Sequence, residues 1–184
     1  MRNLITFLIL IYSISFFSQN LENQVFILGK DSLNINLLSE LIKKEINLNR
    51  VNNGLDTLSF SKYLSIGATR NSKKCADKNG LILEHTEKGD FYEVTQYELE
   101  GTIGYTFILS QIAKSFVSGW MNSPNHRKIL LNKSIKTMGS GVIIKDKIIK
   151  RNAYVCDRQT HNNLIVKAID SKEYYIWVSV RFKN

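Results

Sequence analysis

The sequence feature that most restricts the fold is an amphipathic run that stops at the only proline of the chain. Its apolar residues recur at the spacing of one helix face: Ile108, Leu109, Ile112, Ala113, Phe116, Val117 and Trp120. Pro124 cannot continue this helix and restricts Ser123 to extended backbone, because its ring fixes φ and clashes with the preceding residue. The run therefore predicts a buried helix that ends at Trp120, followed by a rigid turn that presents His126 and Arg127.

The first 18 residues have the features of a secretory signal peptide. Arg2 supplies a positive start, and residues 4–17 are apolar apart from Thr6, Ser13 and Ser15. As a helix this run would measure about 21 Å, which is short of the roughly 30 Å hydrocarbon core of a bilayer. We therefore expect residues 1–18 to be cleaved and the protein to be exported, either secreted or held in the periplasm or cell envelope. An uncleaved membrane anchor is the alternative.

The chain is strongly basic, with 25 Lys and Arg against 16 Asp and Glu and a formal net charge of +9. Residues 1–18 contain one basic and no acidic residue, so the remainder carries 24 − 16 = +8. The basic residues are scattered in short groups without interleaved aromatic residues, which is not the pattern of a nucleic-acid site. We expect no nucleic-acid partner, but loose contact with anionic surfaces is compatible with this charge.

Cys75 and Cys156 are the only cysteines. In an oxidising compartment they can form a disulfide that closes a loop of about 80 residues and stabilises the fold by about 4 kcal/mol. The alternative is two buried thiols, because cysteine is among the most buried residue types. Neither cysteine lies next to a histidine, so we do not expect a catalytic thiol.

Periodicity elsewhere predicts helices first and strands afterwards. A first helix carries Leu37, Leu38, Leu41, Ile42 and Ile46, ends by Asn49-Arg50 and is followed by a turn at 52–54. A second helix runs from Ser59 or Ser61 to about Lys74 and turns Cys75 toward the core. The remainder is rich in Val, Ile and Tyr and predicts strands at 138–144, 148–156, 163–169 and 174–182, with an extra hairpin within 145–171. This order indicates an α+β fold in one domain.

The turn after the central helix resembles the bacterial form of the CAP superfamily, which comprises cysteine-rich secretory proteins, antigen 5 and pathogenesis-related proteins. Trp120-Met-Asn-Ser-Pro-Asn-His-Arg-Lys-Ile-Leu, then Gly139-Ser-Gly-Val, is similar to the family pattern W-x-x-S-P-x-H-R-x-x-[IL]-L and G-x-G-V. The resemblance implies a three-layer α-β-α sandwich over residues 33–182. It makes Trp120, Ser123, Pro124 and Arg127 parts of a cleft or structural motif.

The same resemblance implies a candidate metal site made of His85, Glu93 and His126. His85 follows the second helix, where a family histidine faces the central cleft, and Glu93 stands at the glutamate of the family's G-E-N-[IL] segment. That segment is otherwise altered here, so Glu98 or Glu100 is the alternative counterpart. Two imidazoles and one carboxylate suit a divalent ion such as zinc with open positions.

Each of these residues also has a simpler interpretation. His126 can be a turn histidine satisfied by backbone groups, and His85 an ordinary loop residue. Trp120 is expected to anchor the core rather than to serve as a ligand platform. Arg127 can bind a carboxylate or phosphate, or pair within the fold. The position of the second family glutamate is occupied here by Ser123, which leaves the metal set incomplete.

Three functional hypotheses follow. The first is an exported, non-enzymatic CAP protein whose cleft binds a lipid-like or cell-wall ligand, with His85 and His126 able to hold a divalent ion. The second is a metal-assisted hydrolase in which Glu93 is the general base on a bound water. The third is a structural envelope protein with an inert cleft. A serine hydrolase is not expected, since no G-x-S-x-G motif is present and Ser123 precedes a proline.

Overall fold

The architecture comes from a computed structural model that describes residues 25–27, 34–78, 83, 91–102, 106–156 and 163–184. The expected signal peptide, residues 1–18, lies outside the described residues, and so does His85. Within the described part, no helix combines the length and the apolar character needed to cross a membrane.

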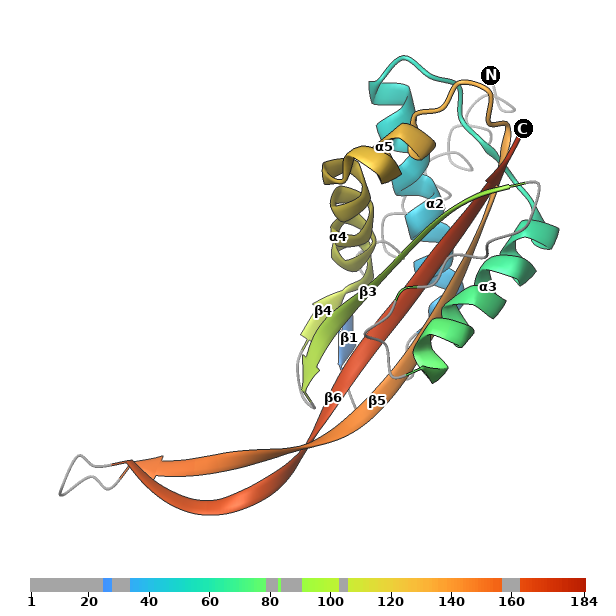
Figure 1. Cartoon of the computed structure of the whole chain (residues 1–184). Helices are drawn as coiled ribbons and strands as arrows, with labels where there is room; N and C mark the ends of the chain where they lie inside the picture. The colour runs from blue at the N-terminus through green and yellow to red at the C-terminus, as the bar shows by residue number, and fades with distance from the viewer. Residues whose placement is uncertain (1–24, 28–33, 79–82, 84–90, 103–105, 157–162) are drawn as a thin grey trace, which may run out of the picture.

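The centre of the molecule is a four-stranded mixed sheet covered by helices on both faces (Figure 1). Its strands lie in the order β2 (Ser59–Phe60), β5 (Thr137–Cys156), β6 (Asn163–Lys183) and β3 (Tyr92–Thr102). β2 pairs with β5 in parallel, whereas the other pairs are antiparallel. A separate antiparallel pair joins β1 (Val25–Ile27) to β4 (Thr106–Ile108).

The helices divide between the two faces of this sheet. Of the described helices, α3 (Lys62–Asp77) is the one that lies against β5 and β6 on one face. The opposite face carries three helices: α2 (Ile35–Asn52), α4 (Leu109–Asn122) and α5 (Pro124–Leu130). The α+β prediction and the three-layer arrangement are therefore confirmed.

The main core lies between the sheet and the three-helix layer. Alternate residues of β6 face this core, because successive side chains of a strand point to opposite faces. The largest buried contributors are Trp120, Phe116, Phe182, Leu38, Ile42, Ile46, Leu109, Leu130, Ile135 and Met138. Trp120 has no exposed surface, so the prediction that it anchors the core is confirmed.

The predicted helices are present, with shifted ends. The side chain of Asn34 caps α2 by accepting a hydrogen bond from the Leu37 backbone at 2.9 Å, and Ser61 caps α3 by accepting one from Leu64. α4 continues two residues past Trp120 to Asn122. Pro124 then occupies the first turn of α5, where its missing N–H costs nothing. The proline thus separates two helices.

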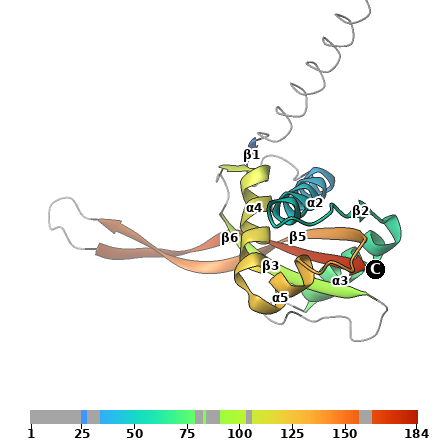
Figure 2. The ribbon, with the colours of Figure 1, turned by 90° about the horizontal axis from the view of Figure 1, so that it is seen from above.

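The strand prediction was wrong in how it divided the C-terminal half. The expected turns at 145–147 and 170–172 lie within continuous strands, so four predicted strands are two long ones. Beyond the body of the sheet, β5 and β6 form a two-stranded ribbon that projects away from the helices (Figure 2). The predicted extra hairpin is this ribbon. None of the described helices covers this ribbon (Figure 2).

Two glycines of β5 allow α3 to lie directly on the sheet. A Cβ at Gly139 would be 2.3 Å from the Ser65 nitrogen, and one at Gly141 would be 2.1 Å from the Thr69 nitrogen. Both neighbours are backbone atoms, which no side-chain rotation can move. The G-x-G-V sequence is therefore a close-packing motif between strand and helix.

Candidate functional site

The structure places His126 and Arg127 in the three-helix layer. Both belong to α5, whose Leu130 is buried in the main core. His126 is half-buried, and Arg127 is exposed on the outer surface. Among the described residues, Arg127 has no ion-pair partner, so its side chain extends into solvent. Ser123 joins α4 to α5, and its backbone N–H donates to the Trp120 carbonyl.

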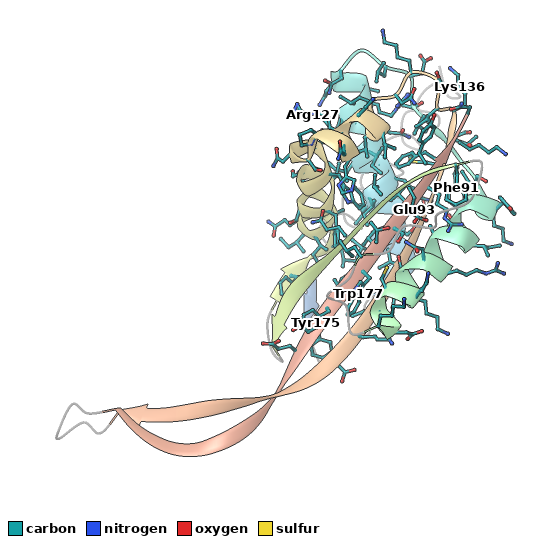
Figure 3. All side chains as sticks on the ribbon, viewed as in Figure 1. Phe91, Glu93, Arg127, Lys136, Tyr175 and Trp177 are labelled. Atoms are coloured by element: carbon teal, nitrogen blue, oxygen red, sulfur yellow. The ribbon has the colours of Figure 1, made fainter. Side chains whose placement is uncertain are left out.

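Glu93 lies in the opposite layer. Its neighbour Val94 is buried in the main core, so Glu93 points to the other face of the sheet, toward α3. There its carboxylate accepts a hydrogen bond from Nε of Arg181 at 2.6 Å, and the side chain is only 3% exposed. Figure 3 shows Glu93 between the sheet and α3, with Arg127 on the far side.

The structure therefore does not bring Glu93 and His126 together. The alternation of β3 sends the carboxylate into one layer, whereas α5 holds the imidazole in the other. In the part of the chain that the structure describes, no three His, Cys, Asp or Glu residues form a group able to hold a metal. The side chains of Glu98 and Glu100 lie outside that description. A metal held by His85 and His126 stays a prediction.

The disulfide considered above is not formed. Cys75 of α3 is a buried thiol that packs with Trp177, next to Ile143. Cys156 is the last residue of β5, 156 − 143 = 13 residues beyond Ile143, which is about 40 Å along a strand. A disulfide needs Cα atoms within about 7 Å of each other. The projecting ribbon therefore separates the two cysteines, while the predicted burial of Cys75 is confirmed.

A pocket lined by described residues opens beside α3. It has a volume of about 360 Å³ and is lined by Tyr63, Leu64, Ile66, Gly67, Arg70, Asn71, Lys74, Phe91 and Arg181. The guanidinium carbon of Arg181 lies 4.2 Å from the centre of the Phe91 ring. Gly67 makes room for this arginine, since a Cβ there would be 2.0 Å from its Nη1. The helix, the aromatic ring and the arginine thus enclose one space.

The pocket lining is basic and partly apolar. Among the described residues that line it, Arg70, Lys74 and Arg181 are charged and none is acidic. Arg181 is paired with Glu93, whereas Arg70 and Lys74 are exposed cations of the pocket lining. The apolar part of the mouth is supplied by Tyr63, 81% exposed, and Ile66, 47% exposed. Such a lining favours a ligand that combines negative charge with an apolar portion.

A network of buried polar groups fixes the wall of this pocket. The amide of Asn71 donates to Thr95 and Ser179 at 3.0 and 3.2 Å. The hydroxyl of Ser72 bonds to Ser179 and donates to the Gly141 carbonyl at 2.9 Å. Because these groups satisfy one another away from water, they hold α3 in one register on the sheet.

Comparison with known proteins identifies the family. The sequence profile of the cysteine-rich secretory protein family, CAP, matches residues 44–157, which lie inside the expected domain of residues 33–182. The chain belongs to the CAP family. No curated protein matches it significantly in sequence.

The chain is similar to several solved structures of bacterial proteins. One is an outer surface protein from Borrelia burgdorferi, 18% identical with a TM-score of 0.44, covering 84% of this chain and 98% of that one. A second is an extracellular protein containing an SCP domain from Bacillus anthracis, 16% identical with a TM-score of 0.45, covering 81% of this chain and 41% of that one. A third is a cysteine-rich secretory protein from Staphylococcus aureus, 17% identical with a TM-score of 0.41, covering 84% and 40%.

Arg50 of this CAP domain joins α2 to the end of α5. Its side chain is 1% exposed and donates to three backbone carbonyls, those of Asp56 at 2.9 Å, Leu130 at 2.7 Å and Asn132 at 3.0 Å. Burial lowers the pKa of the Arg50 guanidinium from its ordinary value, and the nearby charge of Asp56 opposes that shift. The arginine ties the end of α2 to the end of α5 and so positions His126.

Sequence reasoning missed the residues that form the pocket of this CAP protein. Arg70, Lys74, Phe91 and Arg181 come from three separate segments, which only the fold brings together. One local signal was present, because Tyr63 and Ile66 lie three residues apart on the basic side of the second helix. Two apolar residues on a charged helix face are a sign of a contact surface.

Replacing Glu93 with Gln should lower the free energy of unfolding by about 2 kcal/mol, because Arg181 keeps its partial burial but loses the opposite charge. Solvent entering the pocket, and the remaining amide oxygen, limit the loss. Denaturant unfolding measures the change. The control is Lys136→Gln, which breaks a pair with Asp56 in which both side chains are exposed, 64% and 91%, and which should cost less than about 0.5 kcal/mol. Equal effects of the two variants would contradict a structural role for Glu93.

Proposed function

We propose that this CAP protein is a non-enzymatic binding protein whose α3-side pocket takes a small amphipathic anion. The ligand has an anionic group and an apolar portion, as lipid headgroups with their attached chains and fragments of wall polymers do. The observation that carries the proposal is the pocket lining, in which Arg70 and Lys74 stand beside Tyr63, Ile66 and Phe91. The N-terminal sequence supports binding outside the cytoplasm.

The charges of the pocket support an anion rather than a cation or a neutral molecule. Glu93 neutralises Arg181, and the other two charged residues of the described lining, Arg70 and Lys74, are both cations. Arginine and lysine at a partly enclosed site bind phosphate and carboxylate groups by charge-assisted hydrogen bonds. The ring of Phe91 is already covered by Arg181, so the exposed apolar contact comes from Tyr63 and Ile66.

The hydrolase alternative loses support from the placement of Glu93. That hypothesis required the carboxylate to act as a general base near His126, and a general base must lie within hydrogen-bond reach of the proton it takes. Glu93 is instead bonded to Arg181 in the other layer of the sandwich. Binding without turnover is therefore the function that the pocket supports best.

Titration with a short-chain anionic lipid tests this proposal. Dihexanoyl phosphatidylglycerol, kept below its micelle concentration, should bind saturably in a calorimeter, and dihexanoyl phosphatidylcholine should bind less tightly. The double variant Arg70→Gln, Lys74→Gln should weaken binding at least about tenfold, because each lost charge-assisted bond is worth more than about 1.4 kcal/mol.

The matched control for this titration is Lys128→Gln, Lys133→Gln, which removes the same charge at and just beyond α5 and should bind as the wild type does. Circular dichroism establishes that both variants fold. If the wild type shows no saturable binding, or if both double variants weaken it equally, the pocket is not an anion site.

A further inference from the structure

We propose that the outer face of α3 docks the protein on an anionic lipid bilayer, so that the ligand in the pocket is the headgroup of a lipid still in the membrane. The inference rests on the function proposed above, and it names the source of the ligand. We define the docking face by the exposed residues along this side of α3 and its end, which are Lys62, Tyr63, Ile66, Arg70, Lys73, Lys74 and Lys78.

The apolar part of the docking face lies at the first turns of α3. Tyr63 is 81% exposed and Ile66 is 47% exposed, three residues apart on one side of the helix. Neither side chain is buried in the fold, so both present apolar surface to water. A tyrosine beside an aliphatic residue suits the boundary between headgroups and acyl chains, where an amphipathic ring keeps its hydroxyl in the polar zone.

The charged part of the docking face is almost entirely positive. Five cations lie along α3 and its end: Lys62, Arg70, Lys73, Lys74 and Lys78. The single carboxylate among them, Asp77, accepts a hydrogen bond from Lys145 of β5. That hydrogen bond, with the charges of Lys145 and Lys73, lowers the pKa of Asp77. A helix with apolar and basic residues on one exposed side is the form that binds anionic membrane surfaces.

The mouth of the pocket belongs to the same face. Tyr63, Ile66, Arg70 and Lys74 line the pocket and are also members of the docking face. When Arg70 and Lys74 bind the phosphate of a phospholipid, the acyl chains of that lipid thus lie on the side where Tyr63 and Ile66 contact the bilayer. One orientation of the molecule satisfies both contacts.

Other occupants fit this surface less well. A second copy of the chain would bring five cations against five like charges, which opposes association. A soluble polyanion would match the charge but would leave Tyr63 and Ile66 in water. An anionic bilayer has negative headgroups directly above an apolar interior. The headgroups match the charged part of the docking face, and the interior matches its apolar part.

Vesicle sedimentation with the full chain tests the inference. The wild type should bind vesicles of phosphatidylcholine with phosphatidylglycerol and should bind phosphatidylcholine alone at least tenfold more weakly. Tyr63→Ser, Ile66→Ser should lower the partition coefficient at least tenfold. Its matched control is Leu48→Ser, Val51→Ser on α2, where the side chains are 48% and 54% exposed but lie in the other layer; this variant should bind as the wild type does.

A second variant separates docking from the pocket. Lys62→Gln, Lys73→Gln, Lys78→Gln changes only cations that do not line the pocket. It should weaken vesicle binding at least tenfold and leave dihexanoyl phosphatidylglycerol binding unchanged. Short-chain lipid binding without vesicle binding overturns docking alone, whereas absence of both overturns the proposed function as well. Docking would also be overturned if the Tyr63→Ser, Ile66→Ser variant bound vesicles as the wild type does and polyphosphate bound the protein as tightly as vesicles do. Those two results would mean unspecific binding of polyanions.

Discussion

Arg50→Met should lower the free energy of unfolding by about 4 kcal/mol, one of the largest effects expected of any single substitution in this protein. The change removes three hydrogen bonds from a charged donor and leaves the carbonyls of Asp56, Leu130 and Asn132 without it. Such bonds contribute about 1.5–3 kcal/mol each, and the apolar contacts of methionine recover part of the loss. Denaturant unfolding gives the free energy, and amide exchange at Arg127 and Leu131 reports whether α5 loosens.

The control for this prediction is Arg127→Met, which makes the same chemical change at an exposed position of α5. It should alter the free energy of unfolding by less than about 0.5 kcal/mol, as is usual for surface substitutions. If Arg50→Met were as stable as Arg127→Met, the buried guanidinium would not be what joins α2 to α5.

Gly141→Ala should lower the free energy of unfolding by about 3 kcal/mol, since an added methyl group has no space between β5 and α3. Its Cβ would lie 2.1 Å from the nitrogen and 2.4 Å from the Cα of Thr69. Removing this clash requires the whole of α3 to move away from β5. That movement also strains the hydrogen bonds among Asn71, Ser72 and Ser179. Affinity for the short-chain lipid should fall with stability, because α3 forms one wall of the pocket.

Gly119→Ala is the informative comparison. There the added Cβ would meet the end of the Gln96 side chain at 2.7 Å, which can rotate away. Alanine also gains about 1 kcal/mol over glycine inside a helix. We expect the free energy of unfolding of this variant to stay within about 1 kcal/mol of wild type. A loss as large as that of Gly141→Ala would mean that general intolerance of glycine substitution, rather than close approach of α3, explains the first result.

The helices were predictable because each has a local cause. The spacing of apolar residues gave α2 and α4, and the restriction imposed by Pro124 placed the break between α4 and α5. Residues of the family motif proved to have packing roles that the sequence alone did not establish. Trp120 fills the core, and Gly141 admits the α3 backbone.

The strands were less predictable because their environments differ along their length. Residues 145–147 and 170–172 are polar in the way that turns are, yet they continue β5 and β6 into a ribbon that no helix covers. β3 was not predicted at all. Its Glu93 and Thr95 are polar residues on a buried face, which period-two reasoning assigns to solvent unless their partners are known.

The sequence around Glu93 does not show what its carboxylate contacts, and a metal-binding role for this residue stays a prediction. The partner of its carboxylate is Arg181, 88 residues later, and nothing in the local sequence around either residue indicates the pair. The antiparallel register of β3 and β6 places the two side by side. Contacts across a sheet are set by register, so the role of a charged strand residue cannot be settled from its own neighbourhood.

The ion pair between Glu93 and Arg181 divides the pocket into two parts with different freedom to vary. The floor belongs to the fold, because the pair is enclosed by the sheet, Gly67 and Phe91. The rim residues Arg70 and Lys74 are both exposed, so replacing their side chains does not disturb the packing of the core. Ligand preference can thus diverge between related proteins by exchange of rim side chains alone, while the scaffold below them keeps its stability.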